Sequence, residues 1–177
     1  MLFRMFDQIP KLGFTFYDTV LFQAVFLFAF YFGLRVSEFT AYRHNIQLHQ
    51  LDISQKLLKL TFLSFKHSTN QPETHSFASI ISLFCTVNAL LRYLEYRGNS
   101  AGPLFMLHGK PISNQFFSAV LKKVVNALGL AHVNIKSHSF RIGAASFWAE
   151  KGFSEVQIQK MGRWHSKCND IIFQRGS

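Results

Sequence analysis

The chain has 177 residues, of which 49% are hydrophobic, so a disordered chain is excluded and one domain with a sizeable core is expected. It carries 19 Lys and Arg against 9 Asp and Glu, a formal net charge of +10. This surplus favours a polyanionic partner, nucleic acid before an acidic membrane surface.

The cysteines and histidines predict neither a disulfide framework nor a metal centre. Cys85 and Cys168 do not form a C-x-x-C pair, and the 8 histidines are scattered, with no H-E-x-x-H motif. We therefore expect no metal or other cofactor, and a reducing compartment, nuclear or cytoplasmic. Asp7 and Asp18 interrupt the layout of a cleavable signal peptide.

Phenylalanine is abundant, with 21 residues, and it is concentrated in the first third of the chain. Residues 1–18 are expected to be a lead-in broken by Pro10 and Gly13. A helix is expected over 18–32, and it overlaps the apolar run VLFQAVFLFAFYFGL at residues 20–34. This run is shorter than the about 20 residues that span a bilayer, and Gln23 interrupts it, which favours a buried core helix over the alternative of a membrane segment.

Arg35 follows this apolar helix, and Glu38 lies three residues further on. A cation that leaves an apolar segment is costly unless it is paired or faces a polar site. Two interpretations of Arg35 stay open at this point. In one, Arg35 and Glu38 form a surface ion pair on a helix, and in the other, Arg35 faces an anion-binding site.

The pattern changes to strands between residues 45 and 81. Apolar and polar side chains alternate over 58–63, a polar turn follows over 66–72, and a second strand is expected near 76–82. This predicts a β-hairpin with Lys66 at its mouth. Lys66 is either a site residue or an exposed lysine that keeps a sheet edge soluble, and Lys59 competes for the first role.

Two helices are expected in the middle of the chain, over 83–97 and from Ser113 to 128, separated by a loop. Lys122 and Lys123 lie on the outer side of the second helix. A solvated face and a phosphate contact explain them equally well.

The most informative stretch is 136–164, which reads KSHSFRIGAASFWAEKGFSEVQIQKMGRW. Ser137 is a candidate N-cap of its first helix. His138 and Arg141 are three residues apart, a spacing that puts both side chains on one helix face, aimed at one small target.

A second short helix follows in this stretch. Ser154 and Gln157 form a capping box at its start, and Gly162 is expected to end it. Arg163, Trp164 and His165 then fall on a loop. A basic pair on one helix and a Trp/His pair one helix later suit the binding of an anion.

The segments HSFRIGAA and MGRW closely resemble the second conserved region of the tyrosine recombinases, or phage-type integrases. Among these, they resemble the recombinases of animal mobile elements. Arg35 and Glu38 resemble the first conserved region, in which an acid follows an arginine by three residues. The resemblance covers nearly the whole chain. It implies an α+β fold, mostly helical with a small antiparallel β-sheet, which is the DNA breaking-rejoining fold. Residues 1–177 would form one such catalytic domain, without the N-terminal core-binding domain of relatives.

The resemblance also implies an activity, strand breakage and rejoining in DNA recombination and integration through a 3′-phosphotyrosine, without a metal. The implied partner is double-stranded DNA, bound by a homo-oligomer that is a tetramer in relatives, with no membrane. The implied catalytic residues are Arg35 and Arg141 on the scissile phosphate, Lys66 as the acid for the leaving 5′ oxygen, His138 as base or donor, and Trp164 as a packing and hydrogen-bonding residue, with His165 as a further phosphate contact.

The chain departs from the family at the nucleophile. The tyrosine of relatives lies eight or nine residues after the Trp position, where this chain has Ile172 and Phe173, and no tyrosine follows Tyr96. Neither side chain can attack phosphorus, so impaired cleavage is expected. The alternatives are a tyrosine supplied by another protomer, a DNA-binding remnant of a mobile element, or a basic interaction or membrane-associated protein with fortuitous motifs. The linked order of the motifs argues against the last.

Overall fold

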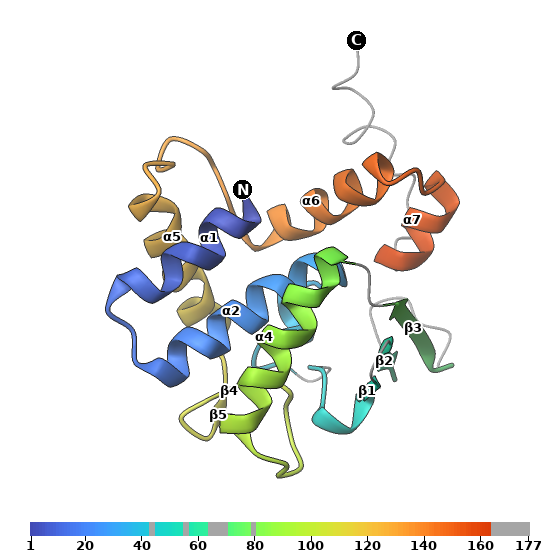
Figure 1. The fold of residues 1–177 in the computed structure, drawn as a ribbon, viewed down its shortest axis with the longest axis horizontal. Coiled ribbons are helices and arrows are strands. Elements are labelled where there is room, and N and C mark those ends of the chain that lie inside the picture. Colours follow the sequence, from blue (N-terminus) through green and yellow to red (C-terminus); the bar gives the residue numbers. More distant parts are fainter. Residues whose placement is uncertain (43–44, 55–56, 64–70, 79–80, 164–177) are drawn as a thin grey trace.

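The structure is a computed structural model that describes residues 1–42, 45–54, 57–63, 71–78 and 81–163, and it is mostly helical with small antiparallel sheets (Figure 1). This confirms the α+β class. The helices are α1 Leu2–Gln8, the 3₁₀ turn η1 Ile9–Leu12, α2 Phe16–Tyr31, α3 Val36–Phe39, the 3₁₀ turn η2 Leu48–Gln50, α4 Ile81–Arg97, α5 Asn114–Ala127, α6 Ser137–Glu150 and α7 Glu155–Gly162. The strands are β1 Leu51–Ser54, β2 Leu57–Phe62, β3 Glu73–Ala78, β4 Met106–Leu107 and β5 Lys110–Pro111.

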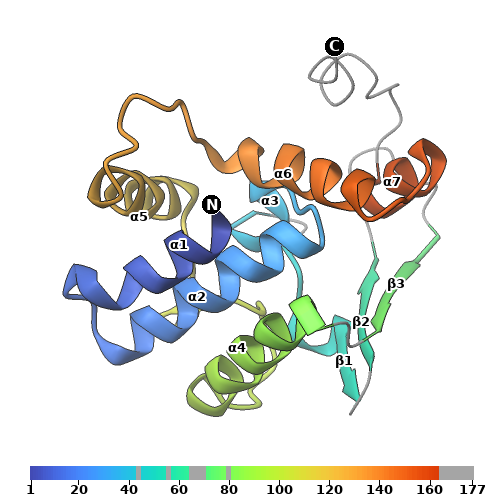
Figure 2. The same cartoon turned by 45° about the horizontal axis from the view of Figure 1, so that its top comes forward.

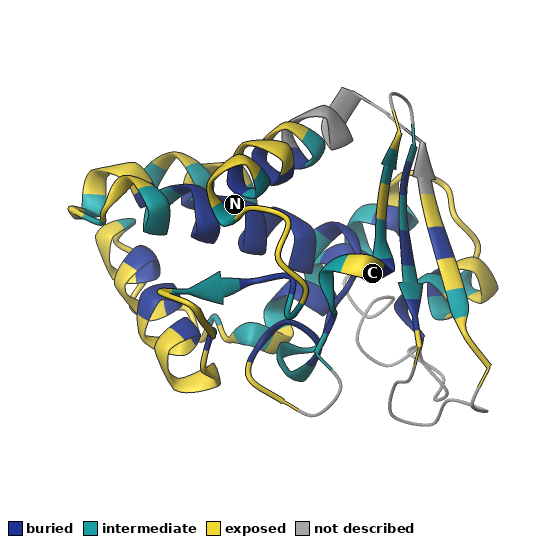
Figure 3. Cartoon of the chain, turned by 90° about the horizontal axis from the view of Figure 1, so that it is seen from below, coloured by how far each residue is buried: buried dark blue, intermediate teal, exposed yellow. Residues whose placement is uncertain are grey.

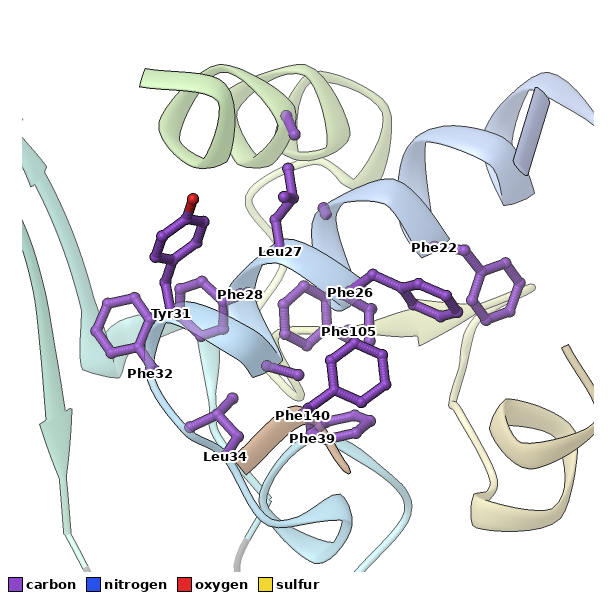
Figure 4. Packing of buried hydrophobic residues seen from close by; sticks show 14 of the residues in the cluster. Phe22, Phe26, Leu27, Phe28, Tyr31, Phe32, Leu34, Phe39, Phe105 and Phe140 are labelled. Atoms are coloured by element: carbon purple, nitrogen blue, oxygen red, sulfur yellow. The ribbon is translucent and has the colours of Figure 1, made fainter. Parts of the chain in front are cut away.

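Helix α2 is the centre of the fold. It is apolar on all sides and nearly every residue from Val20 to Ala29 is buried, as expected for a helix that other elements surround. Figure 2 shows α1, α4 and α6 around it. Phenylalanine rings from α2 meet rings from the loop before β4 and from α6, including Phe105 and Phe140 (Figure 4). The prediction of a buried core helix is confirmed.

None of the described helices is both long enough and apolar enough to cross a membrane.

Helix α6 crosses close to the end of α2 because glycines occupy the contact. A Cβ atom at Gly143 of α6 would lie 2.9 Å from Cε2 of Phe30. Gly33 follows α2 with φ +53°, and a Cβ atom there would lie 3.3 Å from Cη2 of Trp148. This close approach brings the first half of α6 to the chain that leaves α2.

The main sheet has the strand order β1-β2-β3, with both pairings antiparallel. Burial alternates along β2 and places Leu58, Leu60 and Phe62 on one buried face. Phe62 pairs with Glu73, and Leu60 pairs with His75 on β3. In Figure 3 the alternation of buried and intermediate residues is visible along β2, and buried residues line the inner sides of the helices.

The structure differs from the sequence-based expectations at three places. The second hairpin strand is Glu73–Ala78 rather than 76–82, because the mostly apolar residues 80–84 suit a strand or a helix and α4 begins at Ile81. The edge strand β1 was not predicted. Residues 2–12 are helical and bury Met5 and Ile9, since the proline in η1 occupies a first-turn position where a missing N–H costs nothing.

Candidate functional site

Helix α6 starts at Ser137, the residue that the sequence predicted as its N-cap, so the observed N-cap lies one residue earlier. Ser137 is the first helical residue, and the N-cap is Lys136, whose backbone N–H donates to Oγ of Ser139 at 3.1 Å. The prediction that Ser137 caps the helix is therefore wrong, because Ser137 already lies in the first turn and the N-cap position falls on Lys136. The capping box of Ser154 and Gln157 on α7 is confirmed.

Arg141 lies on the inner side of α6 and is only 4% exposed. Its Nη1 donates to the carbonyl oxygen of Gly33 at 2.6 Å, and its Nη2 donates to the carbonyl oxygen of Gly162 at 2.9 Å. The guanidinium thus joins the chain that leaves α2 to the end of α7.

Arg35 reaches the same segment from another direction. It is the N-cap of α3, and its Nη2 donates to the carbonyl oxygen of Arg163 at 3.3 Å. Its side chain is 25% exposed. Arg35 and Arg141 are far apart in the sequence, yet they donate to the carbonyl groups of two consecutive residues, Arg163 and Gly162.

One buried carboxylate holds this cluster together. Oε2 of Glu38 accepts from the backbone N–H of Arg35 at 2.7 Å and from Nη2 of Arg163 at 2.8 Å, and Oε1 lies 3.5 Å from Nη1 of Arg35. The Arg35–Glu38 pair therefore exists, but Glu38 is buried and shared. Arg35 and Arg163 both contact this carboxylate, and Arg141 donates to the neighbouring carbonyl group of Gly162. The guanidinium groups gathered at this segment favour an anion.

Arg163 is the site residue that sequence reasoning missed. It caps α7 in the left-handed conformation, with φ 54° and ψ 47°, and its side chain has 0% exposure. The guanidinium carbon lies 3.8 Å from the ring centroid of Phe62. Burial lowers the pKa of Arg163 and the Glu38 carboxylate opposes this shift, so the group stays charged at neutral pH. One feature of the sequence could have identified Arg163, namely its position directly after the predicted end of an amphipathic helix.

His75 borders this cluster from β3. Its Nε2 lies 3.0 Å from Oε1 of Glu73, and its ring meets the ring of Phe62 edge-on. Burial lowers the pKa of His75, and the Arg163 cation lowers it further, against the raising effect of Glu73. His75 is therefore neutral at pH 7.

The remaining predicted residues divide into two groups. His138 is exposed, one helical turn before Arg141. The others lie outside the described residues: Lys66, Trp164, His165, Ile172 and Phe173. The competitor Lys59 lies on the face of β2 opposite Phe62, with its side chain 44% exposed and 4.0 Å from Asp52, so it points away from the arginine cluster.

A second basic region lies between α5 and the loop that leads into α6. A hollow of about 630 Å³ there is lined by apolar and polar side chains, among them the basic groups Lys122, His132 and Lys136. Among the described residues, no group of three His, Cys, Asp or Glu side chains could hold a metal ion.

The structure thus brings the arginines of the R-x-x-E and H-x-x-R segments, which resemble the two conserved regions of the tyrosine recombinases, to one segment of the chain. A sequence model of the phage integrase family matches residues 7–169. The chain belongs to this family, as a tyrosine recombinase catalytic domain.

Solved structures show the same fold at low sequence identity. The post-cleavage and pre-cleavage complexes of the XerH site-specific recombinase with difH substrates match at 13% identity, with TM-scores of 0.73 and 0.74 over 98% and 97% of this chain. The XerA recombinase matches at 15% identity, with a TM-score of 0.71 over 97% of this chain. This chain covers 49%, 47% and 56% of those chains, about half of their length. A search of curated protein sequences gives no match.

Proposed function

We propose that this domain binds double-stranded DNA at a backbone phosphate through Arg35 and Arg141, and that its own cleavage of DNA is impaired. The observation that carries the proposal is the meeting of both guanidinium groups at the carbonyl groups of residues 162 and 163. Guanidinium forks suit phosphate because they donate paired hydrogen bonds to its oxygens. The names of the two XerH structures describe complexes with difH substrates, which supports DNA as the partner.

The exposure of the cluster gives the direction of approach. Arg35 is a quarter exposed, Arg141 is buried, and His138 is exposed one turn before Arg141 on α6. A phosphate that arrives from solvent would therefore contact Arg35 before Arg141. Lys66, as the acid, and Trp164 with His165, as donors, are assigned by the family motif alone.

The sequence at the nucleophile position favours loss of cleavage. Ile172 and Phe173 stand eight and nine residues after Trp164, and neither has a nucleophilic atom. A second candidate function follows from this observation, a non-catalytic DNA-binding remnant of a mobile element. The two candidates differ in whether the rest of the site still supports the reaction.

The test restores the nucleophile on a nicked suicide substrate that traps a covalent intermediate. The unmodified chain should bind the duplex without forming an adduct, whereas Ile172→Tyr or Phe173→Tyr should form one. In the active tyrosine background, Arg141→Met should lower adduct formation by at least about 100-fold, the effect of losing one donor to a developing negative charge. Arg35→Met is the second variant, because a change at buried Arg141 can affect folding.

Arg4→Met is the matched control, since it removes the same charge from the exposed side of α1. An adduct from the unmodified chain would overturn the proposed impairment. A tyrosine variant that binds DNA but forms no adduct would favour the remnant. If adduct formation persists in Arg35→Met and Arg141→Met, neither arginine binds the scissile phosphate.

A further inference from the structure

We infer that Arg163 is a positioning residue, which holds Arg35 and Arg141 in place for a phosphate. That the site binds phosphate rests on the proposed function, whereas the contacts of Arg163 do not. Both the backbone and the side chain of Arg163 contribute to this role. The side chain is anchored in the protein interior, and the peptide groups beside it orient the two other arginines.

The anchor joins four separate segments. The guanidinium of Arg163 donates to Glu38 at 2.8 Å and lies 3.8 Å from the ring centroid of Phe62 on β2. Its Nη1 also approaches the carbonyl oxygens of Phe32 at 3.5 Å and Met161 at 3.3 Å. α7 lies beside the end of the β2–β3 sheet in both Figure 1 and Figure 2, and Arg163 is the side chain that ties the end of this helix to the sheet.

The peptide groups beside the anchor are the acceptors for the proposed phosphate ligands. The carbonyl oxygen of Gly162 accepts from Arg141, and that of Arg163 accepts from Arg35. Arg163 has φ 54°, a left-handed conformation that is disfavoured for a residue with a Cβ atom. The side-chain contacts maintain this turn together with the backbone N–H of Arg163, which donates to the carbonyl oxygen of Lys160 at 3.0 Å. The turn determines where both carbonyl groups point.

Only arginine supplies all of these contacts at once. The planar guanidinium stacks on Phe62 while it donates to Glu38 and to backbone carbonyl groups. A lysine at this position keeps the charge and the ion pair, but it loses the flat stacking surface and the fixed fork. Arg163→Lys therefore separates the geometry of the anchor from its charge.

The first measurement needs no DNA. The ¹⁵N-resolved guanidinium signals of Arg35 and Arg141 should show restricted rotation in the unmodified chain, and Arg35→Lys and Arg141→Lys assign these signals. In Arg163→Lys, both signals should average through faster rotation, whereas in Arg4→Met they should remain unchanged. A residue that only packs would change the melting temperature and leave the two guanidinium signals as they were.

The second measurement is the affinity for a duplex oligonucleotide. Arg163→Lys should weaken binding about tenfold, as expected when phosphate contacts are misaligned while the net charge is kept. If the unmodified chain binds no duplex, the proposed function fails. The guanidinium signals still show whether Arg163 positions Arg35 and Arg141.

A conservative second variant covers a failure of Arg163→Lys to fold. Phe62→Leu removes the stacked ring and keeps the ion pair with Glu38, and it should also release the two guanidinium signals. The inference would be overturned if folded Arg163→Lys kept the restricted signals of Arg35 and Arg141. If Arg163→Lys does not fold, the same result in folded Phe62→Leu would overturn it.

Discussion

At the scale of single residues, His75 links the stability of the arginine cluster to pH. Its pKa in the folded chain is lowered from 6.5, first by burial and then by Arg163. The unfolded chain therefore binds more protons at this residue between its folded pKa and 6.5. The stabilising contribution of neutral His75 is present above pH 6.5 and is lost as the pH falls through this range.

We expect the free energy of unfolding to fall between about pH 7.5 and pH 5.5, and to fall less steeply in His75→Gln, which lacks the titrating group. Chemical denaturation at several pH values measures this dependence. His132→Gln is the control, because His132 is exposed. Equal pH dependence in the chain and in His75→Gln would contradict the role assigned to His75.

The sequence was sufficient for part of the site. The spacing of Arg35, Glu38, His138 and Arg141 within two motifs selected these residues without a structure, and the structure brings the two arginines to one segment. Arg163 could not be selected in this way. Its partner Glu38 is 125 residues away, and its burial depends on a left-handed turn that most sequences form with glycine.

At the scale of elements, the contact between α2 and α6 sets the distance between Gly33 and Arg141. Gly143 is the point of closest approach, where a Cβ atom would meet Phe30. The ring of Phe30 cannot move away freely, because Tyr31 and Phe147 pack edge-on against it with centroid distances of 5.2 Å and 5.9 Å.

Gly143→Ala should therefore destabilise the protein by about 1 kcal/mol, because the overpacking exceeds the gain in helix propensity. Denaturant unfolding measures the change. A double-mutant cycle with Phe30→Leu should show positive coupling, since the smaller side chain leaves room for the added methyl group. Stabilisation by Gly143→Ala alone would show that α6 does not lie so close to α2.

The predicted elements were most accurate where a long segment carried a clear signal. The core helix was found from its apolar run, and the helix from Ser113 from apolar residues at helical spacing. The helix near Ser137 was found from the spacing of His138 and Arg141. The start of β3 and the edge strand β1 were not, because four to six residues carry too little periodicity to exclude other structures.

At the scale of the whole molecule, the net charge of +10 is available for contacts with many phosphates. The basic hollow beside α5 contributes to it through Lys122 and Lys136, and α6 connects this hollow to the arginine cluster. A duplex that reaches the cluster would extend well beyond one phosphate. The proposed function therefore requires affinity that depends on several ion pairs rather than on Arg35 and Arg141 alone.

We expect the affinity for duplex DNA to fall by about 100-fold between about 50 and 200 mM salt, as for the release of counterions from about four phosphates. Lys122→Gln and Lys136→Gln should each reduce the slope of log affinity against log salt by about 1, while Lys110→Gln, an exposed change on β5, should leave it unchanged. Fluorescence anisotropy over a salt series measures these slopes. Equal slopes in all three variants would show that the hollow does not contact DNA. Binding that does not respond to salt would contradict a phosphate interface anywhere on the domain.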